Sequence, residues 1–126
     1  MALSLTPHML VAAYEYLRTT PPFRGWKLPE ADDIEFRISR HRDREGHYTR
    51  YCRTTDHIVS VSSATIRTTP ALLEVMAHEI IHLRQALIGA ESKTKYQHNA
   101  HFWQTARRVC AIHGWDLAAF VGTPEL

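Results

Sequence analysis

The sequence predicts an α+β fold: an N-terminal helix, a three-stranded antiparallel meander, a long central helix and a C-terminal helix. Three observations support this prediction. Apolar residues recur at helical spacing near both ends of the chain, whereas they alternate with polar residues in the segment between. Prolines and glycines separate these segments. The length of 126 residues suits a single domain, 1–126, since one hydrophobic core commonly serves about 100–150 residues.

The N-terminal helix is expected over residues 7–18. Thr6 offers an N-cap, and Pro7 suits the first helical position, where its missing N–H is not needed. The apolar residues at helical spacing are Leu10, Val11, Tyr14 and Leu17. The next segment, "TTPPFRGWKLPEAD", is dense in proline and glycine. It predicts a loop in which Trp26 packs back against the core.

Three strands are expected between residues 34 and 63. In the first strand, Ile34, Phe36 and Ile38 alternate with polar or charged residues, which is typical of a half-buried strand. The segment "HRDREG" predicts a turn. The segments "HYTRYCRT" and "HIVSVSS" are rich in tyrosine, threonine, isoleucine and valine and predict the second and third strands. Strands joined by such short connections are expected to form an antiparallel meander.

Two helices are expected in the second half of the chain. Thr69 and Pro70 repeat the pattern of a cap followed by proline, and Gly89 suits the end of this long helix. The segment "ESKTKYQHN" is polar and predicts a loop. Residues 99–113 return to helical spacing before Gly114. The apolar stripe of this last helix consists of Phe102, Ala106, Val109 and Cys110.

The composition excludes several classes of protein. Hydrophobic residues make up 44% and charged residues 22% of the chain, which argues against disorder and fibrous repeats. The net charge of +2 is too small to imply a polyanionic partner by itself. No stretch reaches the ~20 apolar residues of a membrane span, and the N-terminus lacks a basic leader, so we expect a cytoplasmic protein. Cys52 and Cys110 are too far apart for a C-x-x-C site and are expected to be reduced core residues.

The segment "MAHEIIHLRQ" places three ionisable side chains inside an apolar helix. His78 and His82 are four residues apart, so a helix rotates them by only about 40° and separates them by about 6 Å of rise. Both imidazoles can therefore reach one metal ion. Glu79 would cost several kcal/mol in this setting, or be neutral, unless a cation compensates its charge. A bound dication removes this conflict.

A catalytic zinc site needs a third protein ligand and an open position for water. The segment "QHNAHFW" supplies His98 at the start of the last helix and His101 one turn later, and Glu91 is the acidic option in the preceding loop. We prefer His98, because the apolar stripe of that helix would pack it against the motif helix. His101 remains the reserve candidate, and Glu91 would make the site similar to that of gluzincin-like peptidases.

These residues resemble the SprT-like (Spartan-type) zinc metallopeptidases. The resemblance rests on H-E-I-I-H at 78–82, a fifteen-residue spacer and H-N-A-H-F at 98–102, and it covers roughly residues 34–113. It implies a zincin-like fold with His78, His82 and His98 as zinc ligands and Glu79 as the catalytic acid/base. Asn99 replaces the usual glycine, and no cysteine-rich zinc-binding segment follows.

The expected reaction is hydrolysis of a peptide bond by a metal-activated water, with Glu79 as the general base. An exposed strand of the meander could align an extended polypeptide substrate by pairing with it. Replacing Glu79 with glutamine should leave zinc bound and abolish cleavage.

The segment 37–53 carries six arginines against Asp43 and Glu45, interleaved with Tyr48 and Tyr51. Such a segment can grip single-stranded nucleic acid, and the resembled family includes DNA-associated proteases. We favour a solvated hairpin whose cationic side chains protect an edge strand. The alternative function is a nucleic-acid-associated protein with a zincin fold and weak or no protease activity.

Overall fold

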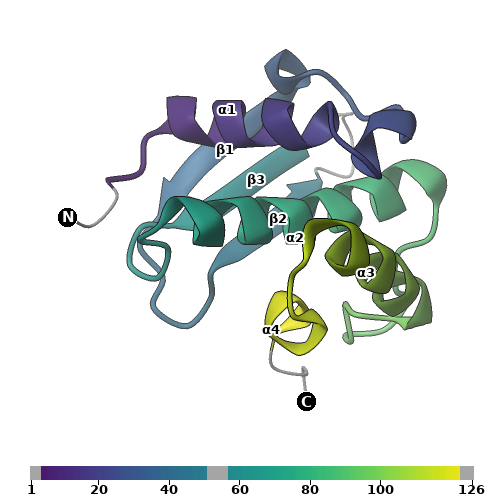
Figure 1. Cartoon of the computed structure of the whole chain (residues 1–126). Coiled ribbons are helices and arrows are strands. Elements are labelled where there is room, and N and C mark those ends of the chain that lie inside the picture. The colour runs from purple at the N-terminus through teal and green to yellow at the C-terminus, as the bar shows by residue number, and fades with distance from the viewer. Residues whose placement is uncertain (1–3, 51–56, 123–126) are drawn as a thin grey trace.

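The computed structural model describes residues 4–50 and 57–122, and it shows an α+β arrangement (Figure 1). Helix α1 leads into the sheet, and three helices follow the sheet. The elements in chain order are α1 (Pro7–Arg18), the 3-10 turns η1 (Phe23–Gly25) and η2 (Ala31–Asp33), β1 (Ile34–Ser39), β2 (Gly46–Arg50), β3 (His57–Ser62), α2 (Thr69–Ile88), α3 (Ala100–His113) and α4 (Leu117–Val121).

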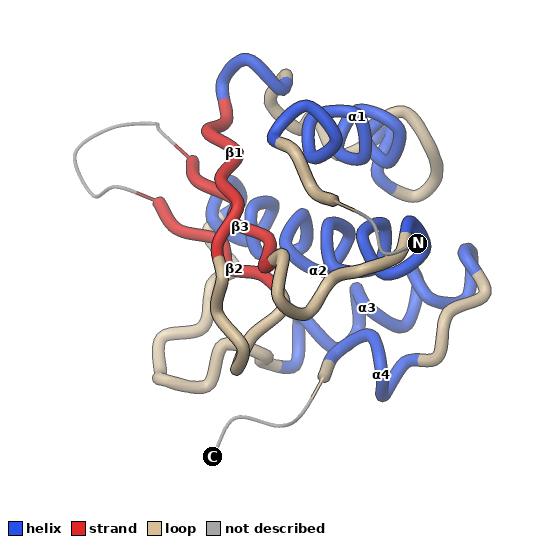
Figure 2. Tube along the Cα trace, turned by 90° about the vertical axis from the view of Figure 1, so that its left-hand side faces the viewer, coloured by secondary structure: helices blue, strands red, loops and turns tan. Residues whose placement is uncertain are grey.

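The sheet is mixed, and its strand order is β1-β3-β2 (Figure 2). Strand β1 runs parallel to β3, with Ile34 opposite His57, whereas β2 runs antiparallel to β3, with Tyr48 opposite Val59. The predicted antiparallel meander is therefore wrong. The physical reason is burial: β3 is buried at nearly every position and takes the centre, while β1 and β2 carry exposed charged residues and lie at the edges.

Helices α1 and α2 lie on the same face of the sheet (Figure 2). Helix α2 contacts β2 and β3 on one side and α3 and α4 on another, so it lies between the sheet and the C-terminal helices. This central position explains why its sequence is apolar on most sides rather than along a single stripe. A polar group on α2 is therefore surrounded by protein unless it faces a groove.

The helix ends lie close to the positions that the sequence predicted. Helix α1 has the predicted bounds and the Thr6 cap. Helix α2 is capped by Thr68 rather than by Thr69, so its start lies one residue earlier than the pattern predicted. Gly89 and Gly114 end α2 and α3 in the left-handed conformation, with φ of 73° and 75°. Helix α4 was not predicted, because five residues are too few to show a helical period.

Other expectations concern the core. Cys110 is buried and is a free cysteine, whereas Cys52 lies outside the described residues. Trp26 packs against the edge of the core, as the loop composition indicated. Within the described residues, no helix combines the length and the apolarity that crossing a bilayer requires.

Candidate metal centre

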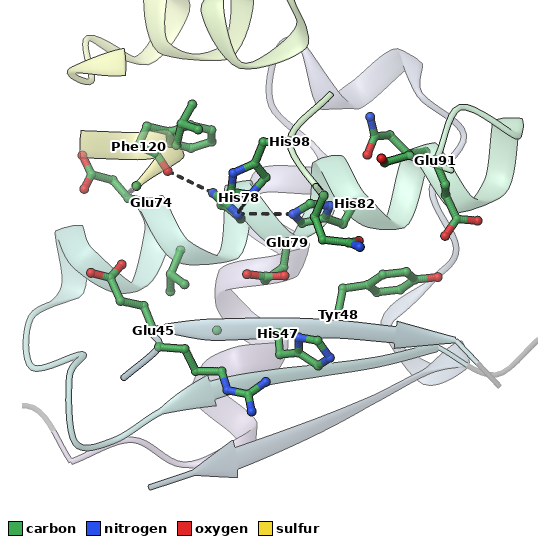
Figure 3. Close-up of a pocket in the computed structure, with 18 of the residues that line it drawn as sticks. Glu45, His47, Tyr48, Glu74, His78, Glu79, His82, Glu91, His98 and Phe120 are labelled. Atoms are coloured by element: carbon green, nitrogen blue, oxygen red, sulfur yellow. Dashed lines mark hydrogen bonds between the residues drawn. The ribbon is translucent and has the colours of Figure 1, made fainter. Parts of the chain in front are cut away.

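Three histidines from two segments of the chain meet above the sheet (Figure 3). His78 and His82 lie one turn apart on α2, and their Nε2 atoms are 3.3 Å apart. His98 comes from the loop just before α3, and its Nε2 lies 3.2 Å from the Nε2 of His78. One ligand atom from each histidine lies within 4.8 Å of the other two. This group could hold a metal ion.

The two distances between Nε2 of His78 and the other imidazoles fit a tetrahedral ion such as zinc. Nitrogens at about 2.0–2.1 Å from such an ion lie about 3.3 Å from one another. The two Nε2–Nε2 distances at His78, 3.3 and 3.2 Å, match this value. A neutral imidazole has a single lone pair for hydrogen bonding, so a common cation accounts for two such neighbours better than hydrogen bonds do.

The ring of His78 is oriented by α4. Its Nδ1 lies 2.9 Å from the backbone oxygen of Phe120. A carbonyl oxygen can only accept, so Nδ1 donates and Nε2 presents its lone pair toward the other two histidines. Metal-ligating histidines commonly have such a partner on the ring nitrogen that does not bind the metal. Helix α4 therefore completes the site, although the sequence did not reveal this helix.

The rings of His82 and His98 are held against α3. Both stack on the buried ring of Phe102, with centroid separations of 4.7 and 4.4 Å. Burial, and to a smaller extent the neighbouring His78 and His98, lower the pKa of His82 to about 3. His82 is thus neutral over the physiological pH range, as a metal ligand must be.

Glu79 is almost fully buried, with 4% of its surface exposed. It comes from the same helix as His78 but points toward the sheet, between the histidines and β2 (Figure 3). Burial raises the pKa of its carboxyl to about 8, with a smaller contribution from Glu45. From the sequence, Glu79 was expected to be neutral unless a cation compensates its charge. The raised pKa agrees with this expectation, since it favours the neutral carboxyl.

Strand β2 approaches Glu79 at Gly46. A Cβ atom added to Gly46 would lie 3.0 Å from Oε2 of Glu79 and 2.8 Å from Cγ2 of Val75. Glycine at the start of this strand therefore allows close contact between β2 and α2. In the sequence, Gly46 indicated only the end of a turn, because this contact with α2 depends on the tertiary structure.

A groove of about 870 Å³ runs between α2 and β2 over the three histidines. Its strand wall is formed by residues 43–48 and Arg50. Its helix wall carries the histidine pair and Glu79, together with Glu74, Val75 and Gln85. Residues 119–122 of α4 and its end line the groove as well, as do Glu91, Ser92, Gln97 and His98. Among the described strands β2 pairs only with β3, so its other edge faces away from the sheet.

The alternative third ligands lie outside the histidine cluster. Nδ1 of His101 lies 3.1 Å from Nε2 of Gln85, so this ring interacts with an amide instead. Glu91 is exposed and lines the groove, but it is not part of the cluster. Of the candidates, the structure brings only His98 together with His78 and His82.

No protein-family model matches the chain, and no curated protein matches it significantly.

Proposed function

We propose that the chain is a zinc-dependent metalloendopeptidase of the SprT-like type. The observation that supports this most strongly is the convergence of His78, His82 and His98 next to the buried carboxyl of Glu79. Three neutral nitrogen ligands leave one tetrahedral position for water, whereas a structural site usually fills all four positions with protein. A structural site would also have no use for Glu79.

The proposed reaction divides the work among these residues. Zinc bound by the three histidines would supply Lewis-acid chemistry, polarising the scissile carbonyl and activating water. Glu79 takes a proton from the attacking water and passes it to the leaving amine. Its buried position makes the carboxylate a stronger base than an exposed glutamate, since burial disfavours the charged form. Phe120 keeps His78 in the tautomer that binds metal.

The proposed substrate is an extended polypeptide. Strand β2 is an edge strand, and it lines the groove opposite the histidines. An extended segment can pair with the backbone of such a strand, which aligns it without requiring a particular sequence. Gly46 and Tyr48 lie on the part of β2 that lines the groove, so a paired segment would pass close to Glu79.

The decisive experiment separates metal binding from catalysis. The Glu79→Gln variant should bind zinc with the stoichiometry of the wild type but lose hydrolysis of an unfolded polypeptide by about 10²-fold or more. Glu35→Gln is the matched control, because Glu35 is exposed on β1 at the opposite edge of the sheet. Turnover by Glu79→Gln at the wild-type rate would overturn the assigned role, as would a zinc-loaded wild type without any hydrolysis.

A second candidate function is association with nucleic acid, with weak or no protease activity. It is favoured by one observation: Arg40, Arg42 and Arg44 are all exposed on the connection between β1 and β2, and Arg44 lines the groove. Replacing these three arginines with glutamine should weaken binding to single-stranded DNA and reduce its salt dependence. The absence of DNA binding by the wild type at low salt would remove this candidate.

A further inference from the structure

Gln85 is an unusual residue in the interior of the protein. Only 1% of its surface is exposed, although it carries a polar amide on a helix whose other buried residues, apart from Glu79, are apolar. A buried amide costs free energy unless its hydrogen bonds are made. Its Nε2 lies 3.0 Å from Oδ1 of Asn99 and 3.1 Å from Nδ1 of His101. Gln85 therefore ties α2 to the first turn of α3.

The side chain of Asn99, the partner of Gln85, takes part in three hydrogen bonds. Its Oδ1 accepts from the backbone N–H of Phe102 at 2.9 Å, which caps α3, and also from Gln85. Its Nδ2 donates to the backbone oxygen of Ala90 at 3.1 Å, close to the end of α2. One side chain thus joins the end of α2, the interior of α2 and the start of α3. The hydrogen-bonding capacity of the amide is largely used.

The position of this link matters because of its neighbours in the chain. His98 directly precedes Asn99 and lies outside any helix. Gln85 lies one turn after His82 and also hydrogen-bonds that imidazole. The link between Gln85 and Asn99 therefore sets the distance between the helix that carries two histidines and the residue next to the third.

We propose that Gln85 and Asn99 are positioning residues that hold His98 in place against His78 and His82. This proposal rests on the metal site of the proposed function. The pair acts before any metal binds: it fixes the loop residue, so that less conformational freedom is lost when three nitrogens converge on one ion. Removing the link should leave the three ligands present but make the third one mobile.

The test measures zinc affinity by competition with chelators, and the melting temperature of the metal-free protein. Gln85→Leu keeps the size and removes the link, and it should weaken zinc binding by about 10- to 100-fold, as is typical for partners of metal ligands. Asn99→Ser keeps a good N-cap for α3 but cannot span the same contacts, and it should give a similar loss. Gln104→Leu, on the exposed face of α3, is the matched control and should bind zinc as the wild type does.

A double-substitution cycle distinguishes positioning from general destabilisation. If Gln85 acts through His98, then Gln85→Leu should cause a smaller loss of zinc affinity in a His98→Ala background, where only its hydrogen bond with His82 still contributes. An equal loss in both backgrounds would overturn the proposal, as would unchanged zinc affinity in Gln85→Leu or Asn99→Ser. If Gln85→Leu does not fold, the same cycle is measured with Asn99→Ser. A wild type that binds no zinc would instead refute the proposed function, so the two failures differ.

Discussion

The two walls of the groove are built in different ways. The helix wall carries His78, His82 and Glu79, with His98 beside it, and these side chains are buried or half-buried. The three histidines are held by contacts with α3 and α4. The strand wall is an edge strand on which His47 and Arg50 are exposed. The groups suited to chemistry are therefore fixed in advance, whereas the wall suited to substrate leaves backbone groups for pairing.

The largest effect is expected from breaking the helix wall at His78. Its Nε2 contacts both other histidines, so His78→Ala removes the central member of the cluster. Losing a residue that only hydrogen-bonds a metal ligand typically weakens metal binding by roughly 10- to 100-fold. Zinc affinity in His78→Ala should fall by more than this, and hydrolysis should disappear. Metal content after dialysis and turnover measure this. His8→Ala, at an exposed position on α1, should match the wild type. Full zinc occupancy in His78→Ala would refute the cluster as the metal site.

The next largest effect is expected on the stability of the metal-free protein as the pH changes. Because burial raises the pKa of Glu79 from its ordinary value of 4.5 to about 8, the unfolded chain releases this proton at lower pH than the folded one. Glu79 therefore lowers the free energy of unfolding progressively as pH rises from about 4.5 to 8.

His82 changes the stability in the opposite direction, since its contribution increases as pH rises. Its pKa is lowered from 6.5 to about 3, so its contribution is lost as pH falls below about 6.5 toward 3. The variant Glu79→Gln cannot titrate, so its metal-free melting temperature should rise relative to the wild type between pH 4.5 and pH 8. Thermal unfolding in the presence of a chelator measures the difference. Parallel curves for the two proteins would mean that Glu79 is not buried as described.

A smaller effect is expected where the two walls touch. In Gly46→Ala, the new methyl group would meet Cγ2 of Val75, Oε2 of Glu79 and the backbone oxygen of Ser60 at 2.8–3.1 Å. Such overpacking costs about 1–3 kcal/mol and should displace Glu79. Turnover should fall with the melting temperature, while zinc affinity stays close to that of the wild type.

Gly25→Ala is the control for this substitution, because a methyl group there meets nothing within 4 Å. Wild-type turnover and stability in Gly46→Ala would show that the contact between β2 and α2 is looser than described. A loss of zinc affinity as large as the loss of turnover would show that the two walls are not separable.

The same comparison explains which parts of the site could be predicted from the sequence. His78, Glu79 and His82 follow from local spacing on one helix, and the helix itself follows from its caps and apolar pattern. His98 was a choice among three candidates, because spacing alone does not say how α3 packs on α2. Its convergence with the other two histidines is a property of the tertiary structure.

Other features of the fold and the site depend on contacts between distant segments, so the sequence pattern gave little indication of them. The strand order depends on which strand is buried on both faces, and the apolar run of "HIVSVSS" was the available clue. Phe120 acts through its backbone oxygen, which no residue type reveals. Asn99 was visible as a departure from the resembled family's glycine, but its contact with Gln85 was not.

The smallest effect is expected at Arg50, which joins the far ends of the two walls. Its guanidinium donates to the backbone oxygen of Ala86 on α2 at 3.2 Å. Arg50→Met keeps much of the apolar length of the side chain and should destabilise the protein by about 0.5–1.5 kcal/mol. Because the guanidinium binds the backbone of α2 and not a histidine side chain, zinc affinity and kcat should be unchanged, while KM for an unfolded polypeptide should rise as β2 moves more freely. Arg107→Met, exposed on α3, is the control. A fall in kcat without a change in KM would mean that the strand wall takes part in chemistry and not only in alignment.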